Sequence, residues 1–550
     1  MSSEPTTAAA DSAEQPPVGA PGGGGRRGMA RNTAIFSVLT GLSRVAGLLR
    51  EIVASSYFAT SGAFSAFTLA FQVPNVVRSL FADAALSAAF VPVFTELLEH
   101  GRRRDAFRLA STLFLLILTV LGAITVLFVV GAGVVMPLFI GDALKPFQDL
   151  TVGLSRVLFP VVLMLGVNGL LVGILNAYDH FTIPALSPLV WNLVILACLV
   201  GSSRVLSGDD QLYGYAVGVL AGTAVQLTMA IPPLRRLGFR FEFGGSVRDP
   251  RVRQVLLLML PVTAGLGLIN FNLLVNSVLG SLVSEDAPRA IDAAFRIYML
   301  PQGIFSVAIA TVLFPALSRL AARRDLDGLR SLTANGMRQV LLLLIPAAAA
   351  TLTLATPIVR LIYQHGEFGP GSTELVSDAL FWFSFSLPTS GVNLLLTRTF
   401  FSLQRPWITT AIAGLNLAVN VAVSVALYEP FGIAGIVVGT AAGSLAMTLA
   451  QAYALRRELH GRLEARETLA ALARMLVAAA ALAGVAYGTW WSLDQLLGRG
   501  IAGQVVSVCG GLLAGAAVYA ALVLALRVRE AAQIRSLVAG RLSRHGRRRP

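Results

Sequence analysis

Charged side chains inside otherwise apolar segments are the residues of this sequence best suited to chemistry. The main set is four arginines, Arg44, Arg50, Arg78 and Arg296. Arginine keeps its charge at physiological pH, and its planar guanidinium group binds phosphate oxygens in pairs. A charge at the centre of a membrane helix costs about 2.5–3.5 kcal/mol on insertion scales, so such residues normally face a cavity or a partner. The four arginines therefore predict an internal cationic cavity suited to a diphosphate group.

Carboxylates near these arginines offer a second interpretation. Arg50 is positioned to pair with Glu51 or Asp83, and Arg296 with Asp292. In that case the ion pairs fix helix packing and bind no ligand. If Glu96 at the cytoplasmic end is set aside, three arginines outnumber two carboxylates in the first two apolar segments, which favours a cavity with excess positive charge.

The spacing of the charged residues Arg44 and Glu51 in the first segment places them on one side of a helix. Arg44, Gly47 and Glu51 follow one another at intervals of three and four residues, so they share a helix face. Gly47 carries no side chain, which leaves room beside the charges for a partner helix or a ligand.

Two amides form a weaker candidate site. Asn416 and Asn420 are four residues apart and share a face. They would contribute to a small cation site or, as we favour, to hydrogen bonds between helices. The sequence contains no phosphate-binding loop, no spacing typical of metal ligands and no supported nucleophile motif. We therefore expect neither an enzyme nor a metal ion or cofactor.

The composition indicates which elements must position these residues. Of the 550 residues, 55% are hydrophobic and 13% are charged, against about 25% charged in soluble domains. Apolar runs such as Leu113–Val135 and Val255–Leu282 recur along the chain. A helix of about 20 residues crosses the roughly 30 Å hydrocarbon core, and strands of a membrane barrel are much shorter. The fold class is therefore predicted to be all-α, polytopic and membrane-spanning.

Fourteen hydrophobic segments follow a Gly-, Ala- and Pro-rich stretch, residues 1–28, that is expected to be a disordered cytoplasmic tail. The segments are 33–57, 62–97, 107–137, 150–177, 184–203, 212–232, 252–283, 288–320, 336–363, 375–402, 407–427, 432–454, 469–491 and 501–526. Residues 527–550 are expected to be a basic cytoplasmic tail.

Loop charges predict the orientation. Arginine clusters precede the first segment and follow the second, sixth, eighth, twelfth and fourteenth, whereas Gly366–Asp378 contains no Lys or Arg. Cytoplasmic loops carry the excess of basic residues, so both termini are predicted to be cytoplasmic. The same rule explains the net charge of +14 without a nucleic-acid partner.

An internal repeat divides the chain. Two motif pairs carry it, Gly166-Val167-Asn168 with Gly391-Val392-Asn393 and Ala70-Phe71 with Ala294-Phe295. The offset stays close to 224 residues and covers six segments. We therefore predict six-helix bundles at 29–240 and 241–458, with the last two helices added at 459–526. Repeated halves with a site between them are typical of transporters.

Prolines occupy nearly equivalent places in the two halves. Pro74 lies in the second segment and Pro301 in the eighth. Helices broken at matching positions often mark a transporter's binding site, whereas an ordinary proline kink is the alternative.

Several of these motifs resemble the MurJ (MviN) lipid II flippases, over about residues 32–526. The matching stretches are Ser43–Glu51, Ala66–Phe67, Ala70–Arg78, Phe81–Asp83, Ala89–Pro92, Leu175–Ala177 with Phe181 and Pro184, Arg296 with Pro301 and Gly303, and Tyr363–Phe368. The resemblance implies a fourteen-helix member of the multidrug/oligosaccharidyl-lipid/polysaccharide exporter superfamily. It also implies that the undecaprenyl-diphosphate-linked peptidoglycan precursor is moved from the inner to the outer leaflet of the bacterial inner membrane.

The resemblance assigns roles to particular residues. It implies that Arg44, Arg50, Arg78 and Arg296 line a central cavity and bind substrate, and that segments 13 and 14 form a groove for the lipid tail. The sequence departs from the family at Ser65, where an Asp is usual. Some members have a sodium site with acidic residues in segments seven and eleven, where this chain has asparagines, so the sequence does not match that sodium site.

Three functions remain open from the sequence. The first is a flippase working by alternating access, in which two halves rock around the cavity. The second is a divergent superfamily exporter of another lipid-linked glycan or of drugs, although cationic drugs would suit an acidic or aromatic pocket better. The third is a non-transporting scaffold for cell-wall synthesis or division proteins.

Overall fold

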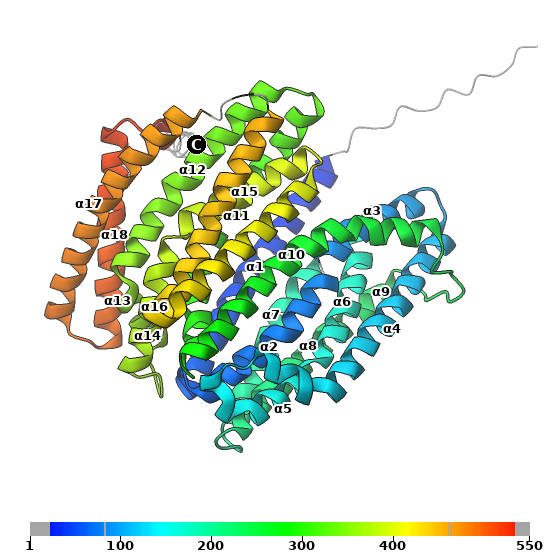
Figure 1. The fold of residues 1–550 in the computed structure, drawn as a ribbon. Coiled ribbons are helices and arrows are strands. Elements are labelled where there is room, and N and C mark those ends of the chain that lie inside the picture. The colour runs from blue at the N-terminus through cyan, green and yellow to red at the C-terminus, as the bar shows by residue number, and fades with distance from the viewer. Residues whose placement is uncertain (1–22, 82–83, 460, 462–463, 534–550) are drawn as a thin grey trace, which may run out of the picture.

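The computed structural model describes residues 23–81, 84–459, 461 and 464–533, and this part of the chain is built from helices without β-strands. Figure 1 shows two groups of helices that diverge toward one end and meet at the other. The chain runs through one group and then through the other, as the repeat predicts.

The described residues of the first half form nine α-helices and two short 3₁₀ helices. They are α1 (Gly23–Phe58), α2 (Gly62–Phe81), α3 (Ala84–Glu99), α4 (Arg103–Val135), η1 (Met136–Phe139), η2 (Asp142–Phe147), α5 (Gln148–Leu158), α6 (Pro160–Ala177), α7 (Thr182–Ser202), α8 (Asp210–Met229) and α9 (Ile231–Arg236). Because α1 begins at Gly23, residues 23–28 are helical, and the expectation that they belong to a disordered tail is wrong.

The second half and the added helices follow. They are α10 (Pro250–Val283), α11 (Ala287–Ala322), α12 (Leu326–Thr353), α13 (Ala355–Tyr363), α14 (Pro370–Ser384), α15 (Leu387–Ser402), α16 (Pro406–Glu458), α17 (Ala465–Leu497) and α18 (Ile501–Ala525). α10 contacts both halves, since it packs on α2 and α3 as well as on α11 and α16. α17 and α18 pair with each other beside α12, at the edge far from α2–α9 (Figure 1).

Several predicted segments are divided in the structure. The second becomes α2 and α3, and the tenth becomes α14 and α15, which are bent by 51°. Proline lacks a backbone N–H and starts helices readily, and Pro160 and Pro388 stand at the beginnings of α6 and α15. Pro74 and Pro301, however, lie inside the continuous helices α2 and α11. The expectation that these two prolines break their helices is therefore wrong.

Residues 406–458 form two helices that fold back on each other. Gly432 has φ 56° and ψ −131°, a conformation open to glycine because it has no Cβ. A Cβ added at Gly439 would collide with Ser424 and Asn420. The two arms therefore pack closely after the chain reverses at Gly432, and they correspond to predicted segments eleven and twelve.

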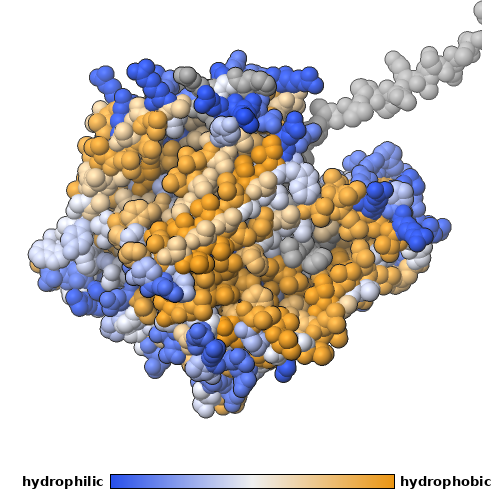
Figure 2. Space-filling model, in the orientation of Figure 1, coloured by the Kyte–Doolittle hydropathy of each residue, from blue (hydrophilic) through white to orange (hydrophobic). Residues whose placement is uncertain are grey.

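Ten helical stretches in the described residues are long and apolar enough to cross a membrane, or up to eleven with the bent pair α14–α15. α16 is counted once among them although it reverses at Gly432. The predicted fourteen spans are compatible with this number but are not confirmed by it. Figure 2 shows a broad hydrophobic belt between hydrophilic rims, as expected for a protein surrounded by lipid.

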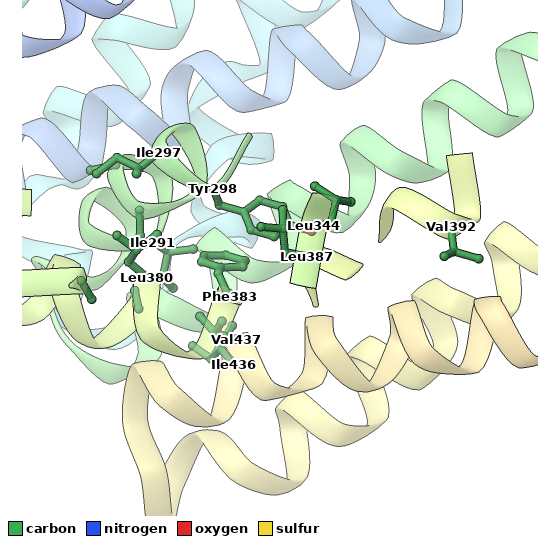
Figure 3. Packing of buried hydrophobic residues seen from close by; sticks show 14 of the residues in the cluster. Ile291, Ile297, Tyr298, Leu344, Leu380, Phe383, Leu387, Val392, Ile436 and Val437 are labelled. Carbon is green, nitrogen blue, oxygen red and sulfur yellow. The ribbon is translucent and has the colours of Figure 1, made fainter. Parts of the chain in front are cut away.

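The buried core of the second half fixes α11 against its neighbours. Tyr298 of α11 lies near Phe383 of α14, with ring centroids 5.4 Å apart, and Ile436 and Val437 of α16 close the cluster from the other side (Figure 3). This packing positions the charged face of α11 described below.

Candidate functional site

A cavity of about 580 Å³ lies between the two halves, walled by α1, α2, α5–α8, α10 and α11. Its polar lining residues are Arg50, Gln72, Asn75, Arg78, Gln226, Asn270, Asp292 and Arg296. Among these described residues three arginines face one carboxylate, which leaves a formal charge of +2. Three of the four predicted arginines thus meet in one chamber.

Glu51 of α1 lies behind the chamber wall at the meeting point of three guanidinium groups. Its carboxylate lies 3.7 Å from Nη2 of Arg50, 2.5 Å from Nη2 of Arg289 and 3.3 Å from Nη1 of Arg296. Glu51 is 2% exposed, so these contacts have little water between them. A buried carboxylate requires such partners, because an isolated buried charge is very costly.

Asp292 links the same arginines from the second half. Its Oδ2 accepts from Nη1 of Arg289 at 3.0 Å and from Nε of Arg296 at 2.8 Å. Glu51 and Arg289 cancel each other formally, so the positive balance of the lining residues persists when these two are included. The ion pairs predicted as an alternative to the cavity therefore exist, but they leave it positively charged.

Two lining arginines are held by further contacts. The Arg50 guanidinium carbon lies 5.1 Å from the ring centre of Trp191, and its buried Nε has no hydrogen-bond partner among the described residues. Arg78 donates from Nε to Asn75 at 2.9 Å, and Asn75 donates to Asn270 at 3.3 Å. These contacts orient both arginines while leaving Arg50 with an unused donor.

The fourth predicted arginine lies apart from the others. Arg44 is exposed and does not line the cavity. A Cβ added at Gly303 of α11 would lie 3.3 Å from its Nη1. α7 packs beside Gly47, where an added Cβ would lie in ordinary van der Waals contact with Asn192 at 3.5 Å.

The secondary candidate residues lie at different places in the structure. Ser65 is fully buried, and its hydroxyl accepts from the backbone N–H of Arg289 at 3.3 Å. Asp83 lies outside the described residues. Asn420 donates to Asn272 and to Asn276 of α10, so these hydrogen bonds connect α16 to α10. Asn416 donates to the sulfur of Met447 at 3.4 Å. Neither asparagine lines the chamber, and no cluster of metal ligands occurs in the described residues.

Sequence reasoning missed Arg289. It is 1% exposed and touches both Glu51 and Asp292. Its spacing from Asp292 and Arg296, at i, i+3 and i+7, was the available signal, since these positions share a helix face. It was overlooked because it lies at the very start of the predicted eighth segment.

A second, apolar cavity lies on the other side of α11. This groove of about 1030 Å³ is lined by residues of α11, α12, α13, α17 and α18 and of the segment after α18. α11 contributes Ile297, Pro301 and Ile304 to the groove but Phe295, Arg296 and Met299 to the chamber. One helix therefore separates a charged chamber from an apolar groove.

The fold and site define a multi-pass helical membrane protein with a positively charged chamber between two repeated halves. The family model described as "Lipid II flippase MurJ" matches residues 54–500. A probable lipid II flippase MurJ of Rhizobium meliloti (strain 1021) is 31% identical over 489 residues, covering 87% of this chain and 90% of that protein. A probable MurJ of Vibrio cholerae is 29% identical, covering 90% of this chain and 95% of that protein. The chain belongs to the MurJ lipid II flippase family.

Solved structures show the same fold. A lipid II flippase MurJ in an inward closed conformation superposes with a TM-score of 0.73 at 20% identity, covering 90% of this chain and 100% of that one. An inward-facing multidrug resistance MATE family transporter superposes with a TM-score of 0.64 at 14% identity, covering 77% and 94%. The architecture is thus shared with transporters of different cargo, and the cargo must be argued from the site.

Proposed function

We propose that this protein is a lipid II flippase, which moves the undecaprenyl-diphosphate-linked peptidoglycan precursor from the inner to the outer leaflet by alternating access. The observation that carries the proposal is the chamber between the halves, where Arg50, Arg78 and Arg296 face a single carboxylate. A diphosphate matches this excess charge in sign, and guanidinium groups bind its oxygens in pairs. The family membership supports the same substrate.

The apolar groove is the proposed site of the polyprenyl tail. α11 alone separates the groove from the chamber. One lipid molecule can therefore place its headgroup near Arg296 and its tail along Ile297 and Ile304. The tail thereby stays in contact with apolar surface and lipid while the headgroup crosses. This assigns a role to α17 and α18, which lie outside the repeat.

We further propose that the protein lies in the bacterial inner membrane with both termini in the cytoplasm, in keeping with the basic loops. With the inside negative, moving a negative headgroup outward is favoured by about 2.3 kcal/mol per charge per 100 mV. The membrane potential therefore favours the outward step. We also propose that the protein contacts cell-wall synthesis or division proteins at the membrane.

Export of cationic drugs is the main rival, because MATE transporters share the fold. The chamber disfavours it, since a positively charged wall repels cationic cargo. A scaffold without transport is disfavoured by the same residues, because charged side chains inside membrane spans are costly where they serve no ligand.

Complementation tests the proposal. In cells depleted of their own flippase, wild type should restore growth and Arg78→Ala should not at equal membrane abundance. The matched control is Arg398→Ala, since Arg398 of α15 lies over the Phe314 ring, 5.6 Å from its centre, and does not line the chamber. Full rescue by Arg78→Ala at normal expression would contradict the assignment.

A further inference from the structure

Arg289 is a buried charge that the chamber itself does not use. It is the most voluminous fully buried side chain of the described residues, and it does not line the cavity. Burying an arginine at 1% exposure requires strong partners. The identity of those partners shows what this side chain does.

Most partners of Arg289 belong to the opposite half of the molecule. Arg289 lies in the first turn of α11 in the second half, yet its Nη2 lies 2.5 Å from Glu51 and donates to Ser55 at 2.8 Å, both on α1. Its guanidinium carbon lies 4.0 Å from the ring centre of Phe64 on α2. Asp292 adds a partner from its own helix. Arg289 therefore joins the two halves by charge, hydrogen bonding and ring contact at once.

The repeat places this contact near the axis that relates the halves. The backbone N–H of Arg289 donates to Ser65, and these residues are 224 positions apart, which is the offset of the repeat. Equivalent positions of two related halves can touch only where the halves meet around their common axis.

Neighbouring contacts close the same end of the chamber. The backbone N–H of Glu367 donates to Ser56 at 2.9 Å, and the hydroxyls of Thr60 and Ser372 lie 2.8 Å apart. These polar contacts join the halves at the helix ends opposite the basic loops. Arg289 is the charged member of this seam.

We propose that Arg289 is a lock between the halves, which holds the chamber closed at its outward end until transport separates α11 from α1 and α2. The proposal rests on the flippase function above and adds the residue that biases the cycle. Opening the outward side must pull Arg289 from Glu51, Ser55 and Phe64 together. Removing the charge should therefore increase the population that is open outward.

Distances between spin labels test this on the full chain in nanodiscs. Labels at Ser207→Cys and Gly371→Cys report across the outward ends of the halves, since both sites are exposed and a Cβ at Gly371 meets nothing within 4 Å. The background carries Cys198→Ser and Cys509→Ser, because both native cysteines are free. The measurement needs no substrate, so it stays informative if the flippase assignment fails.

Arg289→Met should raise the long-distance population about tenfold, from the roughly 0.1–10% common for minor states. Arg289→Lys, which keeps the charge but loses the forked hydrogen bonds, should shift the population less than Arg289→Met. Ser55→Ala removes one hydrogen bond and should shift the population in the same direction by less, which keeps the test valid if Arg289→Met does not fold.

The matched control is Arg338→Met. Arg338 is also a buried arginine, but it contacts Glu464 at 2.8 Å and Glu530 at 2.5 Å, within the second half and its added helices. The control should leave the distances unchanged. The lock would be overturned if folded Arg289→Met left the distance distribution unchanged, or if Arg338→Met shifted it equally. If Arg289→Met does not fold, an unchanged distribution in Ser55→Ala would overturn the lock.

Discussion

Replacing Glu51 by glutamine should strongly destabilise the protein, although the two side chains have almost the same shape. The carboxylate lies within 3.7 Å of three guanidinium groups and is 2% exposed. In Glu51→Gln, Arg289 and Arg296 keep Asp292 as an ion-pair partner, whereas Arg50 loses its contact with the Glu51 carboxylate. Breaking a buried ion pair by removing one partner costs about 3–5 kcal/mol, because the other charge stays buried without compensation.

An exposed ion pair supplies the control. Asp105 lies 2.7 Å from Arg102, but both side chains are substantially exposed. Exposed pairs contribute about 0–1 kcal/mol, so Asp105→Asn should cost that amount. The assay is reversible unfolding in mixed micelles, read as the free energy of unfolding. A loss below 1 kcal/mol for Glu51→Gln, or equal losses in both variants, would refute the assigned electrostatics.

Two further predictions concern the groove and the packing. Ala516→Trp should obstruct the groove and weaken binding of a polyprenyl diphosphate. Ala517 is exposed but does not line the groove, so Ala517→Trp should leave binding unchanged. Equal binding by both variants would contradict the proposed tail site. Gly391→Ala should lower the free energy of unfolding by about 1–3 kcal/mol, because its Cβ would collide with side chains of α11 and α12. Gly484→Ala meets nothing within 4 Å in α17 and should stabilise by roughly 0.5–1 kcal/mol, so a loss in that variant would count against the packing.

Much of the fold was predictable because lipid imposes simple rules. Long apolar runs predict spanning helices, and the repeat predicts two like halves with an addition at the end. Helix breaks were less predictable, because they depend on backbone geometry. Gly432 reverses the chain between the two helical arms of residues 406–458, whereas Pro74 and Pro301 leave their helices intact. Residues 527–550 were predicted only as a basic cytoplasmic tail, and nothing in the sequence indicated that Glu530 pairs with Arg338.

The site was predictable where a charge stood well inside an apolar segment. Arg50, Arg78 and Arg296 meet in the chamber, whereas Arg44 does not line it. Arg289 was missed because a charge at a segment's edge resembles an ordinary loop residue. Its burial arises from contact between the halves, which a single segment's sequence does not express.

Competition between two lipids that differ only in their headgroup tests the central claim most directly. Native mass spectrometry should show wild type binding undecaprenyl diphosphate in preference to undecaprenol. Arg78→Ala should weaken diphosphate binding by about 1.5–3 kcal/mol, or roughly 10–150-fold, as expected for a lost hydrogen bond to a charged group. Equal binding of the two lipids by wild type, or undiminished diphosphate binding by Arg78→Ala, would contradict the account.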